Sequence, residues 1–267
     1  MMKALRGLLL LFCFGALMLM AVPSALAQKS VPPPADSLTG SVPKDVHTRA
    51  KMHTELGSLY FQDGNLIVAL EELTIAISIN PNYAQAYSTR GLVLYYIKEL
   101  ESAEKDFKKA LELDGKDPEI SNNYGWFLCQ IGKEKESIAY FQRAIKNPLY
   151  QTPETAYLNA GTCYIKLGDL ASAEEYIGKN LRFNRENPQA LYQLAVISYK
   201  QGNYDAAKKR LLDVVRLTDP NAGVLWLFVK VSRRLGESEP ENSFTSQLRR
   251  KYPDSPEYME LLKGKFE

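Results

Sequence analysis

Two cysteines, Cys129 and Cys163, are the residues of this sequence whose chemistry is easiest to specify. A pair of thiols can bind a metal or form a disulfide. Zinc sites need further cysteine or histidine ligands close by, and both histidines, His47 and His53, lie far upstream. We therefore expect no metal site, and a disulfide is favoured if the protein enters an oxidising compartment.

The motifs of common active sites are missing from the sequence. It contains no nucleophile elbow, no phosphate-binding loop, no metal-binding His pair and no Cys-x-x-Cys. Charge runs such as KEKE at 133–136 are typical of solvated helix faces. We therefore predict a protein that is not an enzyme, and we expect neither a cofactor nor a small-molecule substrate.

The first 27 residues have the pattern of a secretory signal peptide. Lys3 and Arg6 precede an apolar run, and Ala25 and Ala27 are small residues at the positions that a signal peptidase reads. The apolar run is short for a membrane-spanning helix, which needs about 20 residues. An uncleaved anchor is the alternative. Cys13 lies inside the apolar run and away from the cleavage point, so we recognise no lipid-attachment cysteine.

Residues 28–45 (QKSVPPPADSLTGSVPKD) are rich in Pro, Ser and small polar residues, which predicts a flexible or extended tether. Removal of the signal peptide takes away two of the 33 basic residues and none of the 31 acidic ones, so the mature chain is neutral. A neutral chain without a basic stripe is a poor nucleic-acid binder and has no polybasic membrane patch.

From residue 46 the sequence repeats with a period of 34 residues, interrupted once by two extra residues. Three columns of mostly small residues carry this period. The first column is Gly57, Gly91, Gly125, Gly161, Ala195 and Val229, the second is Gly64, Lys98, Gly132, Gly168, Gly202 and Gly236, and the third is Ala69, Ala103, Ser137, Ala173, Ala207 and Glu241. This pattern resembles the tetratricopeptide repeat, in which each unit is two antiparallel helices. The first column lets helix A approach helix B, and the second makes the turn between them.

The sequence therefore predicts an all-α fold over residues 46–267. We expect a right-handed tetratricopeptide superhelix of six helix-turn-helix repeats with a C-terminal capping helix. The repeats span 50–83, 84–117, 118–153, 154–187, 188–221 and 222–255, and the closing helix spans 256–266. Glu241 and Thr245 make the sixth repeat degenerate, as is expected of a terminal unit whose outer side faces water. The two extra residues fall in 147–153 and indicate a longer turn.

The repeat register brings the two cysteines close to each other. Cys129 and Cys163 fall on the A helices of adjacent repeats, four and two residues past their first-column glycines. Neighbouring helix axes lie about 8–10 Å apart, and facing Cα atoms can reach the ~5.5–6 Å that a disulfide requires. We hypothesise a Cys129–Cys163 disulfide that clamps repeat three to repeat four and adds roughly 3–4 kcal/mol.

The concave face of such an array is lined mainly by the A helices. In this repeat class the groove positions lie three before, and one, four and five after the first-column residue. In repeats two to five these positions are mostly aromatic and aliphatic, which is typical of a binding patch that takes an amphipathic helix or an extended segment. The residues that we expect to contact a partner are Leu92, Tyr95, Tyr96, Asn122, Trp126, Leu158, Ile165, Tyr192, Val196 and Tyr199. The alternative is that several of them only pack against neighbouring repeats.

Two further amides, Asn123 and Asn159, lie beside the groove positions. An amide can hydrogen-bond the backbone of a bound peptide. It can equally bond the helix ends of the next repeat, and the sequence leaves both alternatives open.

Three stretches are more specific than the repeat pattern: NNYGWFLCQIG (122–132), NPLYQTPE (147–154) and NAGTCY (159–164). Together with the export signal and the six repeats, they make the sequence resemble the secretin pilotins of type IV pilus biogenesis over essentially the whole mature chain. The resemblance implies a protein at the inner face of the outer membrane that helps secretin pore subunits to reach that membrane and multimerise. Some members also carry a disulfide between these two repeats. Members typically carry a lipidated cysteine, which we do not find here.

We therefore expect a non-catalytic periplasmic assembly factor that binds the outer-membrane secretin subunit of the type IV pilus. Other pilus assembly proteins are further candidate partners. Without a lipid, the protein would act as a soluble periplasmic factor or stay near the membrane through its partner, and a different start or cleavage site is the third alternative. A general periplasmic adaptor or chaperone unrelated to pili is the rival function.

Overall fold

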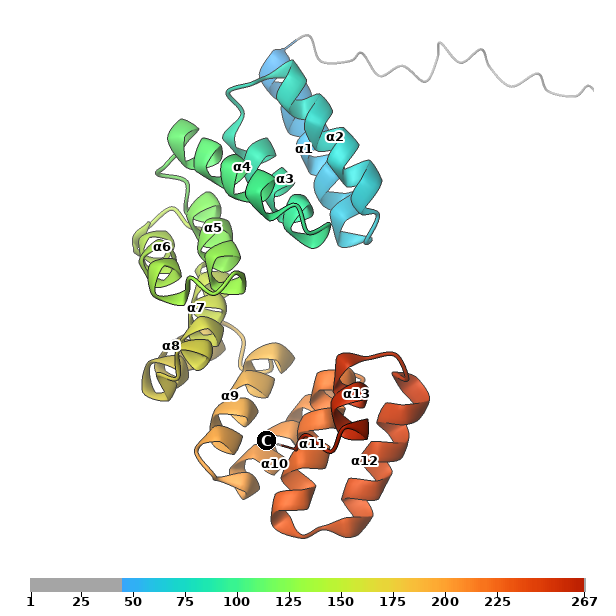
Figure 1. Cartoon of the computed structure of the whole chain (residues 1–267). Helices are drawn as coiled ribbons and strands as arrows, with labels where there is room; N and C mark the ends of the chain where they lie inside the picture. Colours follow the sequence, from blue (N-terminus) through green and yellow to red (C-terminus); the bar gives the residue numbers. More distant parts are fainter. Residues whose placement is uncertain (1–44, 267) are drawn as a thin grey trace, which may run out of the picture. The chain divides into compact units, whose positions relative to one another are not determined.

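The computed structural model describes residues 45–266, and all the regular elements within this range are α-helices. The predicted signal peptide (1–27) and the predicted tether up to residue 44 lie outside the described residues. Over the described range thirteen helices follow one another along the chain (Figure 1). They are α1 (Val46–Gln62), α2 (Leu66–Ile79), α3 (Ala84–Tyr96), α4 (Leu100–Leu113), α5 (Pro118–Gln130), α6 (Glu134–Lys146), α7 (Pro153–Leu167), α8 (Leu170–Phe183), α9 (Pro188–Lys200), α10 (Tyr204–Leu217), α11 (Ala222–Leu235), α12 (Ser238–Lys251) and α13 (Pro256–Leu262). In this part of the chain, none of the helices is both long and apolar enough to cross a membrane.

The helices pair as the 34-residue period predicts. Each odd-numbered helix from α1 to α11 packs against the helix that follows it, which gives six antiparallel hairpins, and α13 closes the series. Each A helix after the first also packs on helix B of the preceding repeat and on the preceding A helix. The predicted all-α tetratricopeptide superhelix of six repeats with a capping helix is therefore confirmed.

The turn inside each hairpin depends on a backbone conformation that favours glycine. The second-column glycines have φ between 74° and 81°, in the left-handed region that an L side chain adopts only with strain. Lys98 occupies the same column with φ of 69°, and it is the one non-glycine residue with positive φ in the described part of the chain. The turn of repeat two is therefore the strained member of the set.

The first-column glycines allow the two helices of a hairpin to approach each other closely. A Cβ atom added to Gly161 would lie 2.5 Å from a side-chain carbon of Ile177, and one added to Gly57 would lie 2.7 Å from Leu73. At Gly91 the same atom would meet the ring of Phe107 at 2.9 Å. The large side chain on helix B thus fills the space that the missing side chain on helix A leaves.

The longer turn between α6 and α7 has a packing role of its own. Tyr150 is buried against Ala144 and Ala156, one from each of the helices that the turn joins. Burial raises the pKa of the Tyr150 phenol to about 12. Asn147 at the start of the turn donates from Nδ2 to the carbonyl of Lys116 at 2.9 Å, so the turn is also tied to the preceding repeat.

The closing helix is shorter than the sequence predicts. α13 ends at Leu262, and the prediction that it continues to residue 266 is wrong. Gly264 adopts a left-handed φ of 67°, and its N–H donates to the carbonyl of Leu261 at 3.0 Å. Lys265 N–H donates to the carbonyl of Glu260 at 3.1 Å, which completes a glycine-terminated helix end. The chain reverses there, and Phe266 packs onto α11.

Candidate partner-binding surface

Four aromatic side chains from three successive A helices meet at the N-terminal part of the concave face. We call Phe61, Tyr95, Tyr96 and Trp126 the aromatic cluster. The ring of Tyr96 stacks on Trp126 with centroids 5.9 Å apart, and Tyr95 meets Trp126 edge-on at 4.9 Å. Phe61 on α1 extends the cluster, with its ring 5.3 Å from that of Tyr96. The structure therefore brings three predicted groove residues together in one patch.

The aromatic cluster is open to solvent. Tyr96 is 48% exposed, and Phe61, Tyr95 and Trp126 are partly buried. Leu92 is also partly buried and packs beside the cluster. Lys98 lies over the ring of Tyr95 at 5.3 Å, which places a cation beside the aromatic surface. An exposed ring that stacks on a partly buried one, with a cation nearby, suits recognition of another polypeptide.

Sequence reasoning missed Phe61, although the signal was available. Phe61 follows Gly57 by four residues, which is the offset of Tyr95 from Gly91. The predicted groove residues begin at repeat two, so the first repeat contributes none of them. Extending the same rule by one repeat would have found it.

Three of the predicted groove residues are buried and have little surface to offer a partner. Leu158 and Ile165 on α7 pack with Leu194 and Val196 of α9, which close over them. Asn122 on α5 is buried as well. The burial of these three residues does not support the expected contact with a partner. It agrees with the alternative, in which they only pack against neighbouring repeats. Direct contact with a ligand would therefore fall to other residues of the groove.

The amides of the middle repeats bond to one another across the A helices. Asn159 Nδ2 donates to Asn122 Oδ1 at 3.0 Å, and Asn122 Nδ2 donates to Asn123 Oδ1 at 3.3 Å. Asn123 Nδ2 in turn donates to Ser88 Oγ at 3.2 Å. This chain links α3, α5 and α7 and differs from both roles that the sequence left open. These hydrogen bonds hold α5, which carries Trp126, against α3 and α7.

The two cysteines are joined in the structure. The Cys129–Cys163 disulfide connects α5 to α7, with Cα atoms 5.9 Å apart, inside the range that the register predicted. Both residues are buried, and Trp126 packs against them. Lys166 Nζ donates to the carbonyl of Cys129 at 3.2 Å and to Oε1 of Gln130 at 2.9 Å, and burial lowers the pKa of this lysine. Disulfide and lysine thus hold repeat three to repeat four directly behind the aromatic cluster.

The C-terminal part of the concave face is covered by the chain itself. Tyr192, Val196 and Tyr199 on α9 are partly buried and pack beside α11. The hydroxyl of Tyr199 donates to the carbonyl of Phe266 at 3.2 Å. The predicted groove position Tyr199 of repeat five therefore lies next to Phe266, whereas Tyr96 of repeat two is exposed.

A second exposed apolar surface lies on α1, and the sequence did not predict it. We call Met52, Leu56 and Leu59, all exposed, the outer face of α1. The residues that occupy the position of Met52 in the five later repeats are all buried. The residues that occupy the position of Leu59 in those repeats are buried as well. The former are Ala86, Ile120, Ala156, Ala190 and Val224, and the latter are Val93, Phe127, Cys163, Ile197 and Val231. A preceding repeat would cover this surface.

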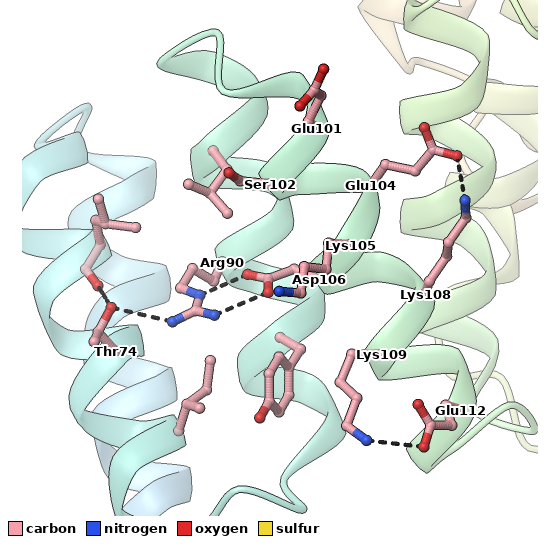
Figure 2. Close-up of a pocket in the computed structure, with 14 residues that line it drawn as sticks. Thr74, Arg90, Glu101, Ser102, Glu104, Lys105, Asp106, Lys108, Lys109 and Glu112 are labelled. Atoms are coloured by element: carbon pink, nitrogen blue, oxygen red, sulfur yellow. Dashed lines mark hydrogen bonds and ion pairs between the residues drawn. The ribbon is translucent and has the colours of Figure 1, made fainter.

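A cleft of about 1040 Å³ lies between α2, α3 and α4 (Figure 2). Arg90 donates to both carboxylate oxygens of Asp106 at 2.7 and 3.0 Å, and this pair ties α3 to α4. Lys108 pairs with Glu104 at 2.8 Å, and Lys109 pairs with Glu112 at 3.0 Å on the rim. Opposite charges alternate around the cleft, so it selects no ligand of one sign. We interpret it as a joint between repeats.

Metal-binding side chains are not gathered anywhere within residues 45–266: no three His, Cys, Asp or Glu residues come together there. His53 Nδ1 lies 2.6 Å from Glu72 Oε2, which links α1 to α2. His47 packs its ring edge-on against Tyr83 at 5.1 Å. His53 thus joins α1 to α2, and His47 contacts the residue that precedes α3.

Comparison with known proteins agrees with this architecture. The tetratricopeptide repeat family matches residues 84–117 and, in a second match, residues 158–222. The chain is 29% identical to the type IV pilus assembly protein PilF of Pseudomonas aeruginosa over 209 residues, which cover 78% of this chain and 83% of PilF.

Two solved structures are similar over nearly their whole length. PilW, a widely conserved type IV pilus biogenesis factor, is 30% identical with a TM-score of 0.71, and the match covers 80% of this chain and 98% of PilW. The structure of Pseudomonas aeruginosa PilF is 28% identical with a TM-score of 0.68, and the match covers 82% of this chain and 99% of PilF. The similarity therefore extends beyond the repeat pattern to the whole described array.

Proposed function

Because this chain belongs to the family of tetratricopeptide-repeat proteins of type IV pilus biogenesis that includes PilW and PilF, we propose that it is a non-catalytic scaffold for assembly of the pilus secretin. It binds the outer-membrane secretin subunit through its concave face and promotes the assembly, stability or localisation of that subunit. Other pilus assembly proteins are further partners. Neither a cofactor nor a small-molecule substrate takes part in this role.

The open aromatic cluster is the observation that carries the proposal. Interfaces derive much of their affinity from a few aromatic anchors at a desolvated centre. Tyr96 and Trp126 present such rings on a rigid support, because the disulfide and the amide chain hold α5 and α7 in place behind them. Binding to preordered rings loses less conformational entropy than binding to mobile ones.

The place of action is proposed from the N-terminal sequence. The signal-peptide pattern over residues 1–27 favours export, and the predicted disulfide suits the periplasm. A position at the inner face of the outer membrane follows from the proposed partner. Since we recognise no lipid-attachment cysteine, we propose that contact with the secretin keeps the protein near that membrane.

The test is binding of the purified secretin subunit to the mature chain and to Tyr96→Ala. We expect binding to weaken about 30-fold, which corresponds to the ~2 kcal/mol typical of a hot-spot residue. Phe183→Ala is the matched control, because Phe183 is an exposed aromatic residue on α8 outside the aromatic cluster. Equal binding of parent, Tyr96→Ala and Trp126→Ala would overturn the assignment of the surface.

A deletion strain separates the pilus role from that of a general periplasmic adaptor or chaperone. Loss of secretin multimers together with loss of twitching motility supports the secretin role. Normal multimers and motility, with a broader envelope defect, would favour the general adaptor.

A further inference from the structure

The last residues of the chain occupy the concave face at repeats five and six. We call residues 256–266 the C-terminal segment and the side chains beneath it, Tyr199, Trp226, Lys230 and Arg233, the C-terminal pocket. These four side chains come from the A helices α9 and α11. They are the C-terminal counterpart of the surface that carries the aromatic cluster.

The segment fills the pocket with an aromatic ring. The ring of Phe266 lies 5.4 Å from that of Trp226, and the guanidinium carbon of Arg233 lies 3.4 Å from the centroid of Phe266. The carbonyl of Phe266 accepts a hydrogen bond from the Tyr199 hydroxyl at 3.2 Å. Ring and backbone are thus both recognised, as in the binding of a peptide.

The segment also supplies a carboxylate. Trp226 Nε1 donates to Glu260 Oε2 at 3.0 Å, and Glu260 acts electrostatically on Lys230. Lys230 Nζ lies over the rings of Tyr199 and Trp226, at 5.1 and 5.6 Å. Burial lowers the pKa of Lys230, with Glu260 opposing that effect and Lys200 adding to it. Glu260 thus brings a negative charge close to Lys230, whereas Arg233 pairs with Glu241 at 2.9 Å.

The covering element is small. α13 has seven residues, none of them buried, and the reversal after it depends on Gly264. An element with so little buried surface opens at a lower free energy than the hairpins beneath it. Trp226, by contrast, is only 4% exposed, and Tyr258, Leu261 and Phe266 of the segment pack on the apolar cluster that contains it. A buried aromatic side chain thus lies beneath a short segment whose own residues are all at least partly exposed.

We propose that the C-terminal pocket is a second peptide-binding site, which the C-terminal segment occupies in the free protein and which a partner segment carrying an acidic residue ahead of an aromatic residue takes by displacing it. The chemistry of the ligand is given by the occupant, with Glu260 as the acid and Phe266 as the ring. This inference rests on the proposed function only in that the concave face binds a partner. Its test needs no secretin, so the two can fail separately.

The first measurement reports whether the cover is in place. The chain has two tryptophans, so Trp126→Phe leaves Trp226 as the only reporter. In that background we expect iodide to quench Trp226 fluorescence several-fold more strongly after Phe266→Ala. Leu262→Ala is the matched control, because Leu262 is an exposed residue of the same stretch. If Trp226 is quenched as strongly in the parent as in Phe266→Ala, the cover does not exist and the proposal is wrong.

The second measurement reports whether the pocket binds peptides. A labelled peptide of residues 256–267 (PEYMELLKGKFE) is titrated into the mature chain and into the double variant Glu260→Gln/Phe266→Ala. We expect at least tenfold tighter binding to the double variant, because the tethered segment of the parent competes at a high effective concentration. A peptide carrying the same two substitutions should bind neither protein. Equal binding to parent and double variant, or no binding to the double variant, would overturn the proposal.

Discussion

At the N-terminal end of the array, Met52 and Leu59 on α1 are 51% and 57% exposed, whereas Trp226 on α11, at the other end, is 4% exposed. Both are A helices: α1 belongs to the first repeat of the described chain and α11 to the last. At the C-terminal end, α12, α13 and the reversed chain end cover α11. At the N-terminal end, none of the described elements covers the outer face of α1.

Within the described residues, the two ends of the array thus differ in whether other elements cover the terminal A helix. A terminal repeat normally carries a polar outer side, because no neighbour will bury it. The C-terminal end instead carries apolar residues and covers them with its own chain. Among the described residues, the N-terminal end leaves Met52, Leu56 and Leu59 exposed, and repeats one to three hold most of the exposed large apolar side chains.

The largest expected effect comes from replacing by alanine the side chain at one position of the repeat. The change is made once in a repeat where this position is buried and once in the repeat where it is exposed. Phe127 and Leu59 both lie two residues past a first-column glycine, but Phe127 is fully buried. We expect Phe127→Ala to cost about 3–5 kcal/mol of unfolding free energy and Leu59→Ala to cost no more than about 0.5 kcal/mol. Urea unfolding followed by circular dichroism measures both. Comparable losses would mean that α1 is covered in solution.

Removing the disulfide tests whether the middle of the array is stabilised independently of its ends. We expect the double variant Cys129→Ser/Cys163→Ser to lose roughly 3–4 kcal/mol of stability by loop-closure reasoning. Amide exchange should accelerate in α5 to α7 and stay unchanged in α1 and α11. A reductant should destabilise the parent and leave the double variant unaffected. Two free thiols in the non-reduced parent, seen by mass spectrometry, would remove the basis of this prediction.

Relief of the strained turn in repeat two is the smallest effect that we predict. Lys98→Gly should stabilise the protein by roughly 0.5–1 kcal/mol. Lysine is strained at the left-handed φ of 69°, and we expect relief of this strain to outweigh the larger backbone entropy that glycine loses on folding. Gly132→Lys is the matched reverse change in the next repeat and should destabilise. A thermal midpoint that falls for Lys98→Gly would show that the lysine side chain makes a compensating contact, for example with Tyr95.

Much of the fold could be predicted from the spacing of small residues. The period fixed the hairpins, and the second column located the turns, including the one that carries Lys98. The disulfide followed from the same register, because two residues at known offsets on adjacent A helices have a nearly fixed Cα separation. These features depend on backbone geometry, which repeats from one unit to the next.

The candidate site could be predicted only in part, because the exposure of each groove residue depends on which side chains of other repeats cover it. The offset rule places Leu158 and Ile165 on the concave side, and it cannot show that Leu194 and Val196 cover them. It also gives no sign that the chain end folds back onto Trp226, although Gly264 signals that the closing helix stops early. Long-range packing of individual side chains leaves little trace in a periodic pattern.

Binding of the secretin subunit to the concave face can be tested by hydrogen–deuterium exchange of the mature chain, with and without the purified subunit. We expect the subunit to slow exchange in α1, α3 and α5, around Tyr96 and Trp126. The opposite face of the same repeats, on α2 and α4, should change little and serves as the internal control. Slowed exchange confined to the cleft between α2 and α4, or no change anywhere in residues 45–266, would contradict it.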